Sequence, residues 1–200
     1  MTNFEIDEPR IPQKLDKLFQ ADNNSNWWHN AWHNFFNNKW DLYAIGYKDA
    51  ADILVQAVLK APGQQHILVY PIVFLYRQYI ELRLKEIIKK GGALLGTFND
   101  IPFGHDIYDL WKKCKEILEV CPKGSLIGLD VVDDLINQFR SEDPESCAFR
   151  YPTDKKGKPS LKIEHINLHN FAEVISGIAN TLDGASGGIS ELLSFKKDIV

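Results

Sequence analysis

Apolar residues recur every three to four positions along most of the chain, and polar or glycine-containing breaks separate these stretches. Such recurrence places the apolar side chains on one face of an α-helix. The clearest example is the set Ile107, Leu110, Trp111, Cys114, Ile117 and Leu118. The expected helices are 11–20, 41–59, a long one that contains 67–90, 106–120, 130–140 and 167–183.

Several residues at the breaks favour helix ends. Asp41, Asp130 and Asn167 can cap helices, because their side-chain oxygens accept hydrogen bonds from backbone N–H groups. Gly91-Gly92 is expected to end the long helix, and Gly184 the last core helix. Residues 189–200 would then form a short docking helix.

One stretch before the last helix lacks the helical pattern. Cys147–Pro152 and Pro159–Ile163 flank the polar residues 154–158, which predicts a turn between two extended segments. We therefore expect a β-hairpin at about 147–163, with Lys155, Lys156 and Lys158 at its exposed tip. Clustered lysines can contact a phosphate backbone, although solvated turn residues are the simpler interpretation.

Together these elements predict an all-α fold, because each apolar helix face must be covered by a neighbour. We expect an antiparallel bundle of four to five helices at 41–184, with the hairpin inserted before its last core helix. A helical arm at 1–40 precedes the bundle, and a tail at 185–200 follows it. The arm is rich in aromatic residues: Trp27, Trp28, Trp32, Phe35, Phe36 and Trp40. On a helix, Trp28, Trp32, Phe35 and Phe36 would share one face. It could pack on its own bundle or on a second subunit.

Composition narrows the class of protein. With 200 residues, 44% of them apolar, the chain can form one well-packed domain with additions. The net charge of −4 argues against a duplex-DNA binder. The three cysteines have no CxxC spacing, the start has no charged-then-apolar leader, and the longest apolar run is short, so we expect a cytoplasmic protein without membrane contact.

Two charged residues interrupt the apolar face of the long helix. Arg77 falls inside this face and Glu81, one turn later, at its edge. Residues at i and i+4 are neighbours on a helix, and a buried guanidinium without a counter-charge is costly. The pair is either an internal strut or part of a functional site.

The order of these motifs resembles the HEPN superfamily of helical bundles. A helix with Tyr43 and Ala50-Ala51 is followed by one that reads 79–86 as YIELRLKE, and Gly104-His105-Asp106-Ile107 opens a third. Phe149-Arg150-Tyr151-Pro152 then precedes the final helix, as in some uncharacterised bacterial members. The resemblance implies a homodimer and roles in RNA cleavage, toxin–antitoxin pairs or phage defence, with an antitoxin or another defence-complex subunit as a protein partner.

The chain departs from the catalytic members of that family. Their ribonuclease motif is an arginine followed, after four to six residues, by a histidine, and no arginine here has a histidine at that spacing. The nearest approximation is Arg150 with His165 or His169. The leading hypothesis is therefore a dimeric binding module for RNA or a nucleotide, without ribonuclease activity.

A metal-independent ribonuclease with an unusual active site is the first alternative. Cleavage needs a proton acceptor, a proton donor and a cation that stabilises the phosphorane, tasks that suit histidine and arginine. The candidate catalytic residues are Arg77, His105 and Arg150. The candidate substrate-binding residues are Glu81, Asp106, Tyr151, Lys155, Lys156, Lys158, His165 and His169.

A purely structural interaction protein is the second alternative. In that case the aromatic arm would be the surface that binds a partner. Several candidates also have a structural interpretation. Arg77 and Glu81 would form an internal ion pair, and His105 would stand at a helix start. Arg150 would pair with a carboxylate of a neighbouring helix instead of a phosphate, and His169 would be solvent-exposed. His29 and His33 have i,i+4 spacing but no third ligand, and no phosphate-binding loop is present. We expect neither a metal nor a cofactor.

Overall fold

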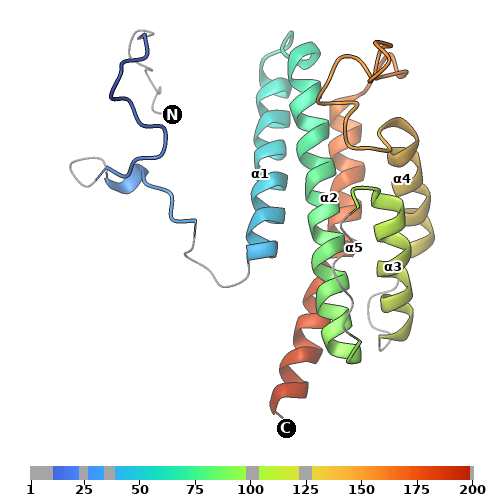
Figure 1. Ribbon diagram of the computed structural model, residues 1–200. Helices are drawn as coiled ribbons and strands as arrows, with labels where there is room; N and C mark the ends of the chain where they lie inside the picture. The colour runs from blue at the N-terminus through green and yellow to red at the C-terminus, as the bar shows by residue number, and fades with distance from the viewer. Residues whose placement is uncertain (1–10, 23–26, 34–38, 98–103, 122–127, 199–200) are drawn as a thin grey trace. The chain divides into compact units, whose positions relative to one another are not determined.

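A computed structural model describes residues 11–22, 27–33, 39–97, 104–121 and 128–198 of the chain. The chain divides into two compact units, 1–37 and 38–200. In the described ranges, the larger unit carries five α-helices (Figure 1): α1 (Lys39–Lys60), α2 (Gln65–Leu95), α3 (Ile107–Val120), α4 (Leu129–Glu142) and α5 (Leu168–Asp198). The prediction of an all-α fold is confirmed.

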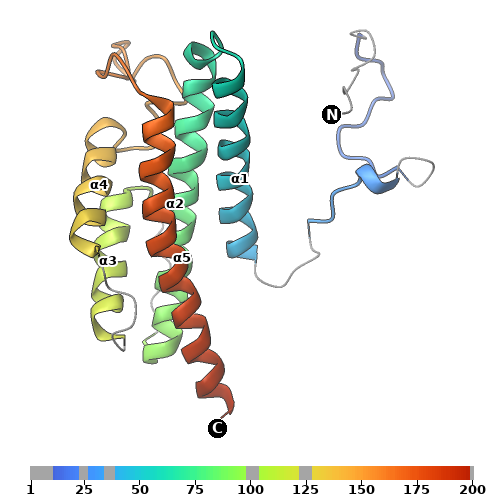
Figure 2. The same cartoon turned by 180° about the vertical axis from the view of Figure 1, so that it is seen from behind.

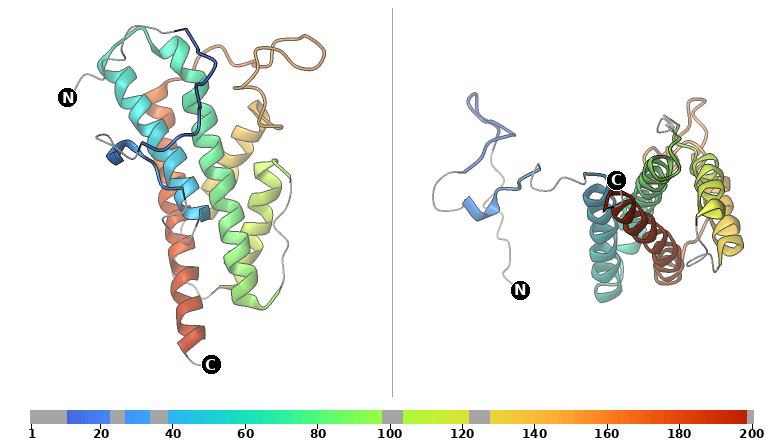
Figure 3. Two further views of the ribbon diagram at one scale, coloured as in Figure 1. Left: turned by 60° about the vertical axis from the view of Figure 1, so that its left-hand side comes forward. Right: turned by 90° about the horizontal axis from the view of Figure 1, so that it is seen from below.

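Helix α2 is the centre of this unit and packs against α1, α3 and α5. Figure 1 shows α1 on one side of α2 and the α3/α4 pair on the other, and Figure 2 shows α5 crossing the back. The view from below in Figure 3 shows the same grouping. The buried face of α2 is consequently wide, and most residues from Tyr76 to Ile88 are buried.

The predicted antiparallel arrangement is only partly correct. Asp52 of α1 pairs with Tyr76 of α2 and Asp41 with Arg83, so α1 and α2 are antiparallel. Helices α2 and α5, however, run in the same direction: Tyr79 bonds Asp183, and Lys196 bonds the carbonyl of Leu94. Helices α2 and α3 are parallel too. The connection 96–106 returns the chain from the end of α2 to the level of Arg77, whose side chain contacts His105, so α3 starts there and runs parallel to α2. Helix α4 then runs back, and Phe139 near its end contacts Phe171 near the start of α5, so the connection 143–167 joins neighbouring helix ends. The helical pattern of the sequence carries no information about these directions.

Two predicted glycine stops lie inside helices. Helix α2 passes through Gly91-Gly92 and ends at Gly96, which has a left-handed φ of 73°. Gly91 instead permits close packing, since a Cβ there would overlap Cγ2 of Ile117 on α3. Helix α5 likewise continues through Gly184 to Asp198, so the separate docking helix at 189–200 is not observed. Burial of Ala185 and Ile189 on neighbouring helices compensates for the glycines.

The predicted caps are confirmed in part. Asn167 accepts a backbone hydrogen bond from Asn170 at the start of α5, as predicted. Asp41 lies within the first turn of α1, which begins at Lys39. Asp106, which was not predicted as a cap, accepts backbone hydrogen bonds from Tyr108 and Asp109 at the start of α3. Asp130 lies within the first turn of α4, whose N-cap residue is Gly128.

The predicted β-hairpin is not found, and the described residues contain no strand. Residues 147–151 form a turn instead, in which the carbonyl of Cys147 accepts hydrogen bonds from Arg150 and Tyr151. One antiparallel bridge joins Thr153 and Pro159 and closes a loop around 154–158. Prolines at 152 and 159 lack the N–H groups that a ladder needs, which explains why only one bridge forms. The lysine-rich tip is exposed, as expected.

The smaller unit has little regular structure where it is described. The expected helix at 11–20 is absent, and turns and bends occupy this range. A short 3₁₀ helix, η1 (Trp27–His29), is stabilised nearby by two hydrogen bonds between Asp22 and Asn30. The predicted aromatic face is thus not formed by Trp28 and Trp32, and Phe35 and Phe36 lie outside the described residues. Among the described helices, none combines the length and apolar character needed to cross a membrane.

Candidate functional site

A cluster of charged side chains joins α2 to the start of α3 and the end of α4. We define the α2–α3 charge cluster as Arg77, Glu81, Lys85, His105 and Asp143. Arg77 and Glu81 sit on the buried face of α2 because the helical period places them among its apolar residues.

The Arg77 guanidinium is fully buried and makes four contacts. Nη2 donates to the backbone carbonyl of His105 (2.7 Å), and Nε to the carbonyl of Asp143 (3.3 Å). Nη1 lies 3.3 Å from the Glu81 carboxylate, and Nε lies 3.5 Å from the Asp143 carboxylate. Every contact is internal, so this guanidinium acts as a strut between helices.

Glu81 is a buried acidic residue of the same helix, and its carboxylate contacts three side chains. Oε2 faces Arg77, while Oε1 lies 2.8 Å from both Lys85 Nζ and His105 Nδ1. Burial lowers the pKa of Arg77 from its ordinary value, and the nearby carboxylates of Asp143 and Glu81 partly offset this effect. Opposite charges are therefore matched within the interior of the bundle.

Asp143 was not predicted as a site residue, although it completes the cluster. Its side chain is 1% exposed, and Oδ1 accepts hydrogen bonds from the N–H groups of Cys147 (2.7 Å) and Ala148 (2.9 Å). In the sequence, the neighbouring Pro144 marks this position only as a helix end. Tertiary packing turns Asp143 into the link between Arg77 and the loop that follows α4.

His105 is the member of the cluster that reaches solvent. Its side chain is 67% exposed, yet Nδ1 is held by Glu81. A carboxylate that is hydrogen-bonded to one imidazole nitrogen fixes the orientation of the ring. Arg77, Glu81 and His105 were all predicted site residues, and the structure brings these three together.

Asp106 has structural partners at the adjacent position. It caps α3, and its Oδ2 accepts a 2.8 Å hydrogen bond from Nε of Arg140 on α4. These contacts use both oxygens of the carboxylate that was predicted to bind substrate.

Arg150 lies on the loop, where its guanidinium is held by four neighbours. Cζ lies 5.6 Å from the ring centroids of both Phe74 and Tyr151. Nε donates to the carbonyl of Ser146 (2.6 Å), and Nη2 to the sulfur of Cys147 (3.4 Å). The residue is exposed, and within the described residues it contacts neither Arg77 nor His105. The three predicted catalytic residues therefore do not form one contiguous group.

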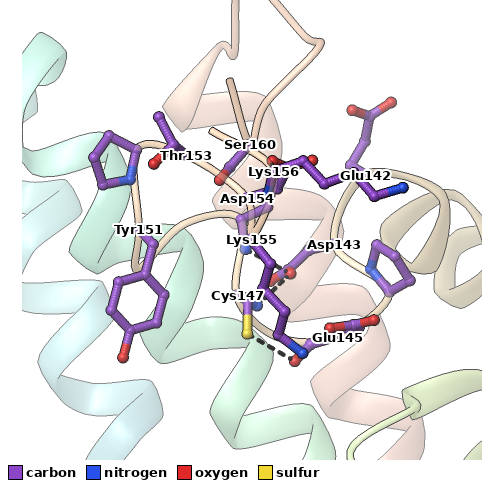
Figure 4. Close-up of a pocket in the computed structure, with 13 residues that line it drawn as sticks. Glu142, Asp143, Glu145, Cys147, Tyr151, Thr153, Asp154, Lys155, Lys156 and Ser160 are labelled. Carbon is purple, nitrogen blue, oxygen red and sulfur yellow. Dashed lines mark hydrogen bonds between the residues drawn. The ribbon is translucent and has the colours of Figure 1, made fainter. Parts of the chain in front are cut away.

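A pocket of about 560 Å³ is bordered by Tyr151, Lys155 and Lys156, and also by Cys147, whose sulfur contacts Arg150. Figure 4 shows these side chains around it, together with four acidic residues: Glu142, Asp143, Glu145 and Asp154. We refer to it as the loop pocket. Two of the carboxylates have internal partners, since Asp143 faces Arg77 and Asp154 accepts hydrogen bonds from the N–H groups of Lys156 and Lys158.

The two candidate histidines lie elsewhere. His165 borders a second pocket, between α4 and α5. His169 is 59% exposed on α5 and lies 3.3 Å from Glu173. Neither makes an observed contact with Arg150 in the described part of the chain.

A second buried network was not predicted from the sequence. Arg83 is ion-paired with Asp41 of α1, with Glu86 of its own helix and with Asp183 of α5. The first and last of these pairs tie α2 to α1 and α5. Burial lowers the pKa of Arg83, but these carboxylates outweigh it and the pKa rises above the ordinary value.

Within the described ranges, no group of three His, Cys, Asp or Glu side chains could hold a metal ion.

Comparisons with protein-family models, with curated proteins and with solved structures found no match. Functional arguments therefore rest on the residues and their geometry.

Proposed function

We propose that the protein is a HEPN-like binding module that recognises the phosphates of RNA or a nucleotide through Arg150 and the lysine-rich loop, without cleaving them. The observation that carries this function is the exposed Arg150 guanidinium held between Phe74 and Tyr151. Pre-positioned guanidinium groups bind phosphate well, because little side-chain entropy is lost on binding.

The remaining hydrogen-bond donors of Arg150 suit this role. An arginine carries five N–H donors in a fixed fork. Nε and Nη2 each make one observed hydrogen bond inside the loop, which leaves further N–H groups for a ligand. Lys155, Lys156 and Lys158 add three positive charges on the same exposed loop. Clustered cations of this kind attract a polyanion independently of its sequence.

Binding of a short labelled single-stranded RNA, measured by fluorescence anisotropy at several salt concentrations, tests this function. We expect Arg150→Gln and Lys155→Gln/Lys156→Gln to weaken binding and to lower the slope of log affinity against log salt. The matched control is Lys60→Gln/Lys197→Gln, which removes two exposed charges from α1 and α5. Equal losses in loop and control variants would count against a site at the loop.

One observation favours ribonuclease activity as a second candidate function. The exposed imidazole of His105 is oriented by the buried Glu81, an arrangement suited to proton transfer. Chelator-resistant RNA cleavage that His105→Gln abolishes, in a variant with wild-type thermal stability, would support it. Intact RNA with wild-type protein would favour the binding module.

The dimer that the resemblance implies is part of the same proposal. Exposed apolar side chains on α1 and at the start of α2, among them Tyr43, Ile53 and Ile67, are available for a partner. Size-exclusion chromatography with light scattering gives the molar mass of the protein in solution. A monomer at micromolar concentration would count against a stable dimer.

A further inference from the structure

A second pocket, of about 330 Å³, lies between α4, α5 and the segment that precedes α5. We name it the α4/α5 slot. Its interior is apolar and combines aliphatic with three aromatic side chains: Val73, Phe139, Phe149, Phe171, Ile175 and Ile178. Phe139 and Phe171 are packed edge to face, with ring centroids 5.8 Å apart. The volume is near the lower end of the range for ligand pockets, which fits one small planar group.

Polar side chains surround this apolar interior. Gln138 of α4, Asn170 of α5 and His165 of the preceding segment all border the slot and are exposed. None of the three side chains makes a hydrogen bond to another described residue. Asparagine and glutamine amides offer a donor and an acceptor side by side, which matches the edge of a nucleobase.

The slot adjoins the loop pocket. Glu142 borders both cavities, and Phe149 of the slot directly precedes Arg150. A ligand could therefore present a planar ring to the slot and an anionic group to Arg150. An unstacked nucleotide has this combination, and aromatic side chains with amide groups are the usual means of holding an unstacked base.

We propose that the α4/α5 slot binds a nucleobase of single-stranded RNA whose phosphates are held by Arg150 and the lysine-rich loop. This inference rests on the proposed function and adds the part of the ligand that is recognised. The base packs against Phe171, and its edge is hydrogen-bonded by Asn170 and Gln138.

The test compares a short single-stranded RNA with an abasic chain that has the same number of phosphates, again by fluorescence anisotropy. Wild type should prefer the base-bearing chain by roughly 10-fold, the effect of one stacked base. Asn170→Leu and Gln138→Leu should each reduce that preference while keeping the salt-dependent binding. Asn180→Leu is the matched control, because it replaces an exposed asparagine of α5 outside the slot.

The outcomes separate this inference from the proposed function. Equal affinity for the two chains would overturn base binding and leave phosphate binding intact. A preference that survives both slot variants would also overturn it, because the bases would then be held elsewhere, for example by exposed tryptophans of the N-terminal unit. Failure of both chains to bind would overturn both. Thermal unfolding of each variant verifies that it is folded.

Discussion

Glu81 Oε1 in the middle of α2 lies 2.8 Å from Nδ1 of His105, just before α3. Arg77, one turn earlier on α2, donates to the backbone carbonyl of the same histidine. The start of α3 is thus held to α2 through both main chain and side chain. Since Arg77 also contacts Asp143, the α2–α3 charge cluster joins three helices in the bundle.

Replacing Arg77 should destabilise the protein strongly. Arg77→Met would leave Glu81 and Asp143 buried with fewer positive partners, and removal of one partner from a buried ion pair costs about 3–5 kcal/mol. Urea unfolding followed by circular dichroism measures this. Arg140→Met is the control, because that arginine is partly exposed where it pairs with Asp106, and its loss should cost no more than about 1 kcal/mol. Similar losses of unfolding free energy in the two variants would contradict the role of Arg77 as a strut between helices.

Asp106 should matter for stability through capping. Asp106→Ala removes the acceptor for two backbone N–H groups of α3, which should cost about 1–2 kcal/mol of unfolding free energy. Asp106→Asn keeps a capping oxygen and should cost less. Neither variant should change RNA affinity, because Arg140 and the helix start occupy this side chain. Loss of RNA binding by a folded Asp106→Asn protein would instead support the predicted role of Asp106 in substrate binding.

Two glycines should respond to alanine in opposite directions. Gly91→Ala places a methyl group against Ile117 and should destabilise the protein by about 1–3 kcal/mol. At Gly187 of α5, no neighbouring atom lies within 4 Å of the place that a methyl group would take. Gly187→Ala should therefore stabilise the protein by about 0.5–1 kcal/mol through helix propensity. Thermal unfolding measures both changes. A Gly91→Ala protein as stable as wild type would refute this packing of α2 on α3, and a destabilised Gly187→Ala protein would refute the open space at that position.

Cys114 should be unreactive in the folded protein. It is completely buried on α3, and burial raises the pKa of its thiol above the ordinary value. Cys147 and Cys121 are partly exposed. A thiol reagent at neutral pH should therefore modify Cys147 and Cys121 before Cys114, which should react only on unfolding. Mass spectrometry of peptides after timed labelling identifies the order.

The same thiol should make stability fall in alkaline solution. The folded protein keeps the Cys114 proton at pH values where the unfolded chain, with a thiol pKa of about 8.5, loses it. The unfolded state then binds fewer protons, so the free energy of unfolding falls as pH rises, by up to about 1.4 kcal/mol per pH unit. Urea unfolding between about pH 8 and about pH 9.5 should show this fall, and Cys114→Ala should reduce it. An identical slope in that variant would assign the effect to other groups.

The sequence by itself determined the helical class, the approximate location of the five helices of the larger unit and the apolar faces on which most of their buried residues lie. These follow from local physics, because the apolar period and the capping side chains act within one helix. Arg77 and Glu81 were recognised for the same reason, since their i,i+4 spacing on a buried face is a local signal.

Only the tertiary structure decided which helices are parallel, where α2 and α5 end, and which side chains meet. Asp143 contacts Arg77, and Phe74 contacts Arg150, although the partners are far apart in the sequence. No spacing in the sequence predicts these contacts. Glycines at 91 and 184 favour helix ends locally, but packing against neighbouring helices outweighs that preference. The predicted hairpin does not form for a related reason: Pro152 and Pro159 have no N–H to donate to a ladder, and the turn at Cys147 pairs the N–H groups of Arg150 and Tyr151 locally.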